Sequence, residues 1–203
     1  RTNPPIVSTE LRTLDLARLR SAVSHSAGFA MLARINQSNA SQDLTARSNV
    51  ADIATRGPLT PDHVIRTKRV PLIVEEDFKQ SLARYIKDYE DYYSRYSSNH
   101  HTRLDSAPRW AVWPGQGTVT FGRSLKDLHV VGDIVEHTCS AIVNGEHLGG
   151  WRALPAEDIF AVEYWELEQA KLGKSGKAPD FQGKIALVSG AASGIGQSCA
   201  ETL

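Results

Sequence analysis

The stretch Arg109-Trp-Ala-Val-Trp-Pro-Gly-Gln-Gly-Thr-Val-Thr-Phe-Gly-Arg-Ser-Leu-Lys-Asp127 decides the fold. Residues 109–113 and 118–121 are short, apolar and rich in β-branched and aromatic side chains, which is typical of strands. Residues 114–117 contain proline and two glycines and predict the turn between them. Ser124 precedes Asp127 by three residues, a spacing that resembles a capping box, so a helix should begin there. The stretch therefore predicts a strand–turn–strand–helix unit of an α/β domain.

A long amphipathic helix is predicted over residues 75–96, upstream of this unit. Its apolar and aromatic positions recur every three or four residues and form one stripe: Phe78, Leu82, Tyr85, Tyr89, Tyr92 and Tyr96. Such a stripe could stack on bases or sugars, but at helical spacing it more often packs against a neighbouring layer or subunit. We therefore expect it to be part of the packing.

Weaker patterns predict the other elements. Leucines at helical spacing indicate a helix over residues 9–24, whereas residues 29–49 are polar and read as a loop with one short element. Thr60 and Pro61 are the expected N-cap and first residue of a short helix. The remaining predictions are strands at 50–55 and 70–74 (the latter at a sheet edge because of Pro71), a helix from 124 to about 144–145, and a helix over 156–170.

The C-terminal residues 181–203 predict the start of a nucleotide-binding unit. An apolar strand at 185–188 precedes a glycine-rich turn and a helix start, an order in which backbone N–H groups can receive a pyrophosphate. The turn resembles the T-G-x-x-x-G-I-G motif of the short-chain dehydrogenase/reductase family, with Ser189 in place of the usual threonine. The resemblance implies cofactor contacts from Ser189, Gly190, Ser193, Gly194, Ile195 and Gly196.

The implied cofactor is NAD, because residues 191–193 bring no basic side chain into the turn; NADP stays open, since the acidic residue that would decide lies beyond Leu203. In that family the catalytic serine, tyrosine and lysine also lie well beyond the first helix. The chain therefore holds no catalytic residue of the dehydrogenase, and we interpret it as a segment of a larger polypeptide that is inactive on its own.

The fold-deciding stretch is similar to one in class II aldolases and adducins. There a His-Gly pair is followed by four mostly apolar residues, a glycine and a helix led by serine or threonine, and the histidine helps to hold a divalent metal, usually zinc. In this chain Gln116 occupies the histidine's position, and a neutral amide is a poor zinc ligand. The resemblance thus implies an aldolase-like region without its metal site and places any divalent metal outside this chain.

The two resemblances together look like the bifunctional rhamnulose-1-phosphate aldolase/alcohol dehydrogenase family, and residues 57–72 and 159–168 resemble it as well. They imply an α/β fold: a three-layer, partial or degenerate class II aldolase-like domain at 1–170, a linker at 171–183, and a β-turn-α Rossmann remnant at 184–203. The implied function is carbohydrate catabolism. One half would cleave a ketose 1-phosphate such as rhamnulose 1-phosphate, and the other would oxidise the resulting aldehyde with NAD.

His63, Arg66 and Lys68 are the candidate substrate-binding residues, because arginine and lysine bind phosphate groups well. The alternative is a solvated basic face beside Asp62. Other polar groups read as structural: the adjacent His100 and His101 as a surface loop, Cys139 as a buried thiol, and four residues of one helix as a surface without metal, namely His129, Asp133, Glu136 and His137.

Composition excludes several classes of function. Lys and Arg total 23 and Asp and Glu total 23, so no basic field favours nucleic acid. Two cysteines provide no disulfide framework, and no apolar run is long enough for a membrane span, so we expect a cytoplasmic protein without a membrane partner. A small-molecule sugar phosphate or aldehyde is the expected ligand, and the chain is expected to form a homo-oligomer. A different interpretation stays open: a non-catalytic domain that links or oligomerises catalytic modules.

Overall fold

The computed structural model describes residues 12–172 and 179–203, and a four-stranded sheet lies at its centre. The strands are β1 (Leu32–Asn36), β2 (Leu72–Ile73), β3 (Trp110–Trp113) and β4 (Gly117–Gly122). Their order is β1-β4-β3-β2; β4 pairs antiparallel with both β1 and β3, and β2 pairs parallel with β3. The predicted edge strand at 70–74 is confirmed, since β2 lies at one edge.

The hairpin of β3 and β4 confirms the strand–turn–strand prediction. Trp113 pairs with Gly117 across a tight turn, in which the Gln116 N–H donates to the Trp113 carbonyl at 2.9 Å. Gly117 has φ +120°, and a Cβ there would lie 2.3 Å from the carbonyl oxygen of Asn36 in β1. Only glycine lets the two strands approach this closely.

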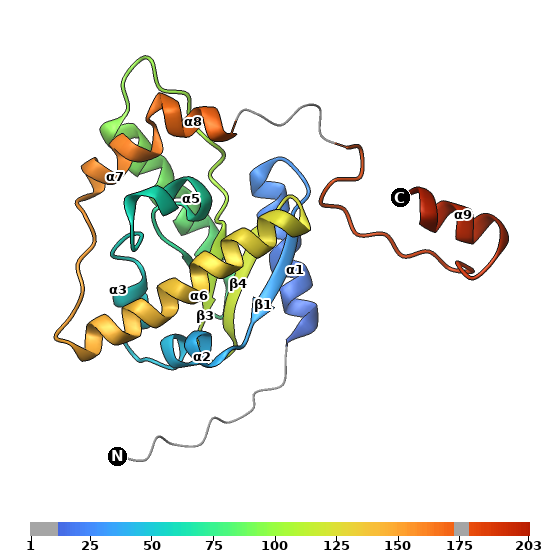
Figure 1. The fold of residues 1–203 in the computed structure, drawn as a ribbon, viewed down its shortest axis with the longest axis horizontal. Helices are drawn as coiled ribbons and strands as arrows, with labels where there is room; N and C mark the ends of the chain where they lie inside the picture. Colours follow the sequence, from blue (N-terminus) through green and yellow to red (C-terminus); the bar gives the residue numbers. More distant parts are fainter. Residues whose placement is uncertain (1–11, 173–178) are drawn as a thin grey trace, which may run out of the picture.

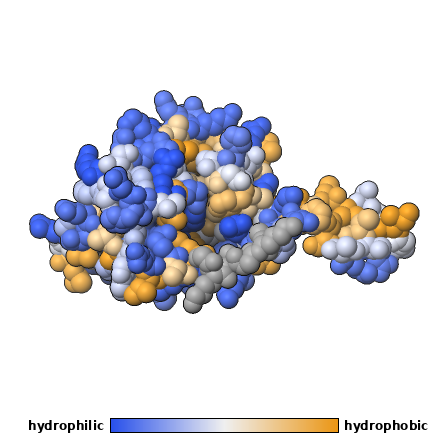
Figure 2. Space-filling model, turned by 90° about the horizontal axis from the view of Figure 1, so that it is seen from above, coloured by the Kyte–Doolittle hydropathy of each residue, from blue (hydrophilic) through white to orange (hydrophobic). Residues whose placement is uncertain are grey.

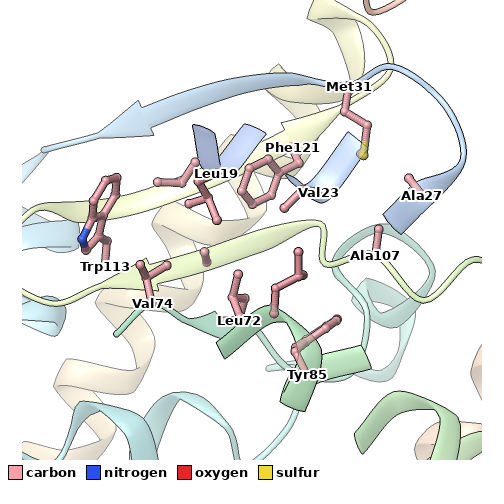
Figure 3. Close-up of a cluster of buried hydrophobic side chains, with 13 residues drawn as sticks. Leu19, Val23, Ala27, Met31, Leu72, Val74, Tyr85, Ala107, Trp113 and Phe121 are labelled. Carbon is pink, nitrogen blue, oxygen red and sulfur yellow. The ribbon is translucent and has the colours of Figure 1, made fainter. Parts of the chain in front are cut away.

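One face of the sheet is covered by α1 (Thr13–Ala27) and α5 (Phe78–Tyr96). Figure 3 shows Trp113 and Phe121 of the sheet facing Leu19 and Val23 of α1, with Tyr85 of α5 on the same side. Phe121 and Val23 are fully buried at 0% exposure. This packing explains the register of β3, because alternate side chains of a strand point to opposite faces.

The opposite face is covered by α2 (Asn39–Thr45), α3 (Val50–Ala54) and α6 (Leu125–His147) (Figure 1). Trp110 and Val112 of β3 meet a second buried cluster there, which includes Val135 and Ile142 of α6. The chain thus forms three layers, helices–sheet–helices, as the resemblance to class II aldolases implied.

A third cluster of aromatic side chains joins the far end of α5 to α7 (Ala156–Glu163). Tyr89 and Tyr92 pack with Phe160 and Tyr164, and the Phe160 and Tyr164 rings stack with centroids 4.5 Å apart. The packing interpretation of the tyrosine stripe is therefore confirmed. Three further short helices lie beside α7: η1 (Pro61–His63), α4 (Val64–Thr67) and α8 (Glu166–Leu172). The helix expected over 156–170 is therefore two, α7 and α8.

Two long helices begin at side-chain caps. The Ser124 hydroxyl accepts from the Asp127 N–H at 3.1 Å, and the Asp77 carboxylate accepts from Lys79 and Gln80 N–H groups. The cap predicted at Ser124 is confirmed, although α6 runs past the expected stop to His147. Pro61 does begin a short helix, but the Thr60 side chain makes no cap hydrogen bond.

Two predictions in the N-terminal third are wrong. Residues 50–55 were expected as a strand, but Val50, Ile53 and Ala54 are buried at helical spacing on one face of α3. Residues 29–49 were expected as mostly loop, but they contain β1 and α2. Their apolar signal is weak because β1 is half-buried and α2 buries Ser41, whose hydroxyl bonds to the Asn36 carbonyl and the Thr118 side chain.

The C-terminal segment leaves the three-layer body and ends in α9 (Gly194–Thr202) (Figure 1). No strand forms at residues 184–188, so the structure does not show the expected Rossmann unit. A strand needs a neighbour for its backbone groups, and none lies beside these residues in the described part of the chain. Figure 2 shows this end as largely hydrophobic, and Leu187 is 100% and Ile195 86% exposed. Within 12–172 and 179–203, no helix has both the length and the apolar character of a membrane span.

Candidate functional site

Lys68 is buried in an unusual backbone conformation directly after α4. Its φ is 63° and its ψ 172°, a region that glycine occupies almost exclusively and that costs other residues about 1–3 kcal/mol. Among the described residues it alone has positive φ without being glycine. The residue itself is only 3% exposed. The contacts of the buried Lys68 side chain accompany this strained backbone and help to hold it in place.

The Lys68 ammonium group contacts three other elements. It donates to the Tyr89 hydroxyl of α5 at 2.9 Å and to the Asp105 carbonyl at 2.7 Å, and it lies 3.9 Å from the Glu163 carboxylate of α7. The Tyr89 hydroxyl in turn donates to Glu163 at 3.1 Å and lies 2.7 Å from the Tyr164 hydroxyl. We call Lys68, Tyr89, Glu163 and Tyr164 the buried network.

Burial determines the protonation of this network. Loss of hydration is the largest effect on Lys68 and, helped by the Arg109 charge, lowers its pKa to about 8, although Glu163 and Asp105 oppose the shift. Burial likewise raises the pKa of Glu163 above its usual range, against the opposing charge of Lys68. Both shifts have the same cause, because burial penalises the charged form of each group.

An ion pair supports the network from the sheet side. Arg109 makes two hydrogen bonds to the Asp105 carboxylate, at 2.8 and 2.5 Å. Burial acts to raise the pKa of Asp105, but the hydrogen bonds and charge of Arg109 outweigh it, so the pKa falls below its ordinary value. Asp105 therefore stays ionised, and the loop that presents its carbonyl to Lys68 is fixed by a bidentate pair.

Lys68 is one of the residues that line a cavity of about 790 Å³ between α4, the start of α6, the end of α8 and residues 179–182. Five basic and two acidic side chains line it: Arg66, Lys68, Arg109, Arg123 and Lys171, with Asp105 and Asp127. A second cavity of about 560 Å³ is lined by Tyr89, Arg69 and Tyr92. Two members of the buried network thus each line a cavity, Lys68 the first and Tyr89 the second.

Two of the cavity's arginines carry charge that no described carboxylate neutralises. Arg109 pairs with Asp105 and Lys171 with Glu168, whereas Arg66 and Arg123 make no ion pair within residues 12–172 and 179–203. Arg123 instead lies over the Phe29 ring, 4.5 Å from its centroid. The N-terminus of α6 opens on the same cavity through Ser124, and free N–H groups of a helix start favour an anion. The cavity is suited to a negatively charged ligand.

The structure brings together two of the three predicted substrate-binding residues. Arg66 and Lys68 both line the cavity, but Lys68 is buried and not part of an exposed basic face. His63 does not line it. Burial lowers the pKa of His63, with Asp62 opposing and His137 reinforcing the shift, and its Nδ1 is buried without a hydrogen-bond partner.

Sequence reasoning missed the partners of Lys68 as a site. Tyr89 was read as packing, and Asp105, Arg109 and Arg123 were not singled out. Glu163 carried the clearest signal, since it is a lone carboxylate in the apolar stretch Ile-Phe-Ala-Val-Glu-Tyr-Trp and is fully buried. A charged residue at a buried position of an apolar helix normally has a partner, which here is Lys68.

The residue at the aldolase histidine position, Gln116, lies buried in the β3–β4 turn. Its backbone carbonyl accepts a hydrogen bond from the Gln37 side-chain amide at 3.1 Å, and its side-chain Oε1 has no hydrogen-bond partner.

His100 and His101 lie with ring centroids 4.4 Å apart, and His101 packs edge-on against Phe160. In the described ranges no three His, Cys, Asp or Glu side chains gather closely enough to hold a metal ion.

The predicted cofactor turn, residues 189–196, is compact and open to solvent. Gly190 and Gly194 have φ of +65° and +60°, and a Cβ on Gly196 would lie 2.4 Å from the Gly190 carbonyl. Ser193 occupies the N-cap position of α9 without a side-chain cap bond, and Ser189 and Ile195 are exposed. The glycines thus allow the turn that the motif requires, and cofactor binding by these residues stays a prediction.

Comparisons with known proteins place this geometry in a family. The family model for the second domain of class II aldolases matches residues 11–172. A protein of Bacillus subtilis (strain 168), described as the uncharacterized oxidoreductase YuxG, is 30% identical over 154 residues, which cover 70% of this chain and 22% of that protein. The chain therefore spans about a fifth of the length of this relative. No solved structure matches the chain. From the family match and the three-layer α/β body that carries it, we conclude that the chain belongs to the class II aldolase second-domain family.

Proposed function

We propose that this chain is the aldolase-like domain of a bifunctional carbohydrate-catabolism enzyme, in which a class II sugar-phosphate aldolase is fused to an NAD-dependent short-chain dehydrogenase. Three observations support the proposal: the class II aldolase family match, the relative described as an oxidoreductase, and the glycine turn before α9. The ketose 1-phosphate would be rhamnulose 1-phosphate, and the aldehyde released would be oxidised by the dehydrogenase half. The metal of the aldolase reaction would be held outside this chain.

The role of the chain itself is to bind the phosphorylated sugar in the cavity beside Lys68. The observation that carries this role is the pair of arginines, Arg66 and Arg123, which line the cavity without an ion pair among the described residues. Arginine matches phosphate by paired hydrogen bonds, and a partly enclosed site weakens competition from water. The hydroxyl of Ser124 at the same cavity could bond to the sugar.

Calorimetry of ligand binding tests this role. Rhamnulose 1-phosphate should bind to the protein. Rhamnulose should bind at least about tenfold more weakly, because it lacks the phosphate group that the arginines would bind; a tenfold loss of affinity corresponds to about 1.4 kcal/mol. Arg66→Ala and Arg123→Ala should each weaken binding of the phosphate ester. Lys126→Ala is the matched control, since Lys126 is exposed on the first turn of α6 but does not line the cavity. Equal binding by all three variants would contradict the role.

The two activities need the longer polypeptide that contains this chain. Purified from its gene, that protein should reduce NAD in the presence of lactaldehyde and release lactaldehyde from rhamnulose 1-phosphate in a metal-dependent reaction. Gly190→Val should abolish NAD reduction and leave aldol cleavage intact, because a branched side chain at φ +65° blocks the turn. If NADP replaces NAD without loss of rate, the cofactor part of the proposal is wrong.

A second candidate role, as a domain that links or oligomerises catalytic modules, is favoured by the exposed apolar side chains Ile185, Leu187 and Ile195. Such side chains gain stability when a partner covers them. Light scattering coupled to size-exclusion chromatography checks this role. A tight oligomer at all concentrations, with no binding of sugar phosphate, would favour it over the ligand-binding role.

A further inference from the structure

One wall of the cavity of about 790 Å³ comes from a part of the chain that follows the three-layer body. Pro179 and Gln182 line the cavity, although they lie beyond residue 172, where the family match ends. The Gln182 N–H donates to the Pro179 carbonyl at 3.0 Å, which closes a turn. We call residues 179–184 the covering segment. Without this segment the cavity would be open on this side.

Gly183 is the residue through which the covering segment contacts the body. It is buried, and its φ is +73°. A Cβ at this position would lie 2.3 Å from the carbonyl oxygen of Ala30, just before β1, and 3.4 Å from that of Arg123, directly after β4. Backbone atoms at the end of a sheet cannot easily shift to make room, so the contact requires glycine.

The same contact reaches the side of the cavity that is suited to an anion. Arg123, whose backbone lies beside Gly183, is one of the two arginines that line the cavity without an ion pair among the described residues. Gln182 lines the cavity as well, and its side-chain amide makes no hydrogen bond within residues 12–172 and 179–203. An amide both donates and accepts hydrogen bonds, which matches the hydroxyl group of a ligand.

We propose that the covering segment is part of the ligand site, with Gln182 bonded to a hydroxyl group of the ligand while Arg66 and Arg123 hold its anionic end. The proposal rests on the proposed function for the class of ligand, a phosphorylated sugar. A ligand that contacts both the body and the covering segment holds the two together. By reciprocity, the docked segment raises the affinity for the ligand by the same factor.

The weak contacts of the covering segment favour docking that depends on the ligand. Gly183 is buried, but Phe181 and Lys184 are exposed, and the Lys184 ammonium group lies over the Phe181 ring and not over the body. In the described ranges, no ion pair or side-chain hydrogen bond joins the segment to the body. So small a buried apolar area stabilises the docked position only slightly. A ligand that bridges the two sides therefore supplies a large share of what holds the segment in place.

Calorimetry on a matched pair of glycine variants of the whole chain tests the proposal. Gly183→Ala adds a Cβ that meets the Ala30 carbonyl, whereas Gly115→Ala adds one at nearly the same φ, +71°, with nothing within 4 Å. Gly183→Ala should weaken binding of rhamnulose 1-phosphate about fivefold or more, the lower end of typical coupling between sites. Gly115→Ala should leave the affinity unchanged, because it adds the same backbone strain away from the cavity.

Two further measurements separate a binding role of the segment from a structural one. Gln182→Ala should weaken binding of rhamnulose 1-phosphate about two- to tenfold, the loss expected for one hydrogen bond. Hydrogen exchange of the wild type should slow at the amides of residues 181–184 when the ligand is added. Urea unfolding verifies the fold of each variant, and Gln182→Ala decides if Gly183→Ala does not fold.

A second probe, glycerol 3-phosphate, separates this proposal from the proposed function. If the wild type binds rhamnulose 1-phosphate, and Gly183→Ala and Gln182→Ala bind it equally well, the covering segment is not part of the site and the sugar-phosphate assignment stands. If only glycerol 3-phosphate binds, and Gly183→Ala weakens its binding, the segment is part of the site and the sugar-phosphate assignment fails. Absence of binding by both probes overturns both proposals.

Discussion

Lys68 and Glu163 form a buried pair, 3.9 Å apart, whose contribution to stability depends on both partners. Both side chains are almost completely buried, so each charge loses its hydration and is compensated mainly by the other. Breaking such a pair from one side leaves an isolated charge, whereas removing both partners removes the penalty as well. The energetic role of the pair is therefore a coupling, which only a double substitution can measure.

A double-mutant cycle should reveal this coupling. We expect Lys68→Met and Glu163→Gln each to lower the free energy of unfolding, and the double variant to lose about 1–3 kcal/mol less than their sum, the range typical of residues in contact. Urea unfolding at pH 7 measures all four proteins. Strictly additive losses would mean that the two groups do not interact in the folded state.

The lowered pKa of Lys68 predicts an unusual pH dependence. Below about pH 8 the amine is protonated in both the folded and the unfolded protein, so the full burial penalty is present. Between about 8 and 10 the folded protein holds fewer protons than the unfolded chain, so stability should rise with pH by about 2 kcal/mol. Above pH 10 the free energy of unfolding should fall. A buried tyrosine such as Tyr164, whose pKa is raised to about 12, stays protonated in the folded protein but ionises in the unfolded chain.

Unfolding free energies at pH 7.5, 8.5 and 9.5 check this dependence. The wild type should gain stability over this interval, and Lys68→Met should show no gain. Groups with raised pKa values do not produce this gain in stability. Glu163, whose pKa is raised, makes the free energy of unfolding fall as the pH rises through its pKa in the folded protein. A flat profile in the wild type would mean that Lys68 is solvated.

How much of the site could be predicted from the sequence depends on distance along the chain. Arg66 and Lys68 were identifiable because they follow one another within a few residues of a helix start. Their partners were not identifiable, because they lie far away in the sequence. Tyr89 is 21 residues and Asp105 is 37 residues from Lys68, and Glu163 is 74 residues from Tyr89. His63 does not line the cavity, because neighbours in sequence on a short helix need not face the same side.

At the scale of elements, helix caps provide a matched set of variants. Ser124 and Asp77 make side-chain cap bonds at the starts of α6 and α5, whereas Thr60 occupies a cap position before η1 without one. Ser124→Ala and Asp77→Ala should each destabilise the protein by about 1 kcal/mol. Thr60→Ala should change the urea midpoint much less, and an equal loss at all three positions would show that the cap bonds contribute nothing specific.

Elements were predictable wherever one periodic apolar face carries the packing. The stripe of α5 is of this kind, and the short apolar runs of β3 and β4, which are buried at every position, were equally recognisable; all three elements formed as expected. Residues 50–55 were misread because six residues are too few to separate a strand from one helical turn. β1 and α2 were not predicted because their contacts are partly polar, as in the hydrogen bonds of the Ser41 hydroxyl to Asn36 and Thr118.

At the scale of the molecule, three buried clusters support one another, and the C-terminal segment belongs to none of them. Two clusters lie on opposite faces of the sheet, and the aromatic cluster joins α5 to α7. The described C-terminal residues approach the body at Gly183, where a Cβ would lie 2.3 Å from the Ala30 carbonyl. The family match also ends at residue 172. The stability of the body should therefore not depend on residues 173–203.

Two truncations test this independence. A chain that ends at Leu172 should unfold at the same urea concentration and with the same denaturant dependence as the whole chain, because α9 and its exposed side chains bury almost no apolar surface. A chain that ends at Leu148 should be destabilised by several kcal/mol, since it loses Phe160, Tyr164 and the partner of Lys68, with about 3–5 kcal/mol expected for one large buried aromatic alone. If removal of residues 173–203 instead lowers the midpoint as much as removal of α7 and α8, the C-terminal segment is an integral part of the fold and the boundary placed at residue 172 is wrong.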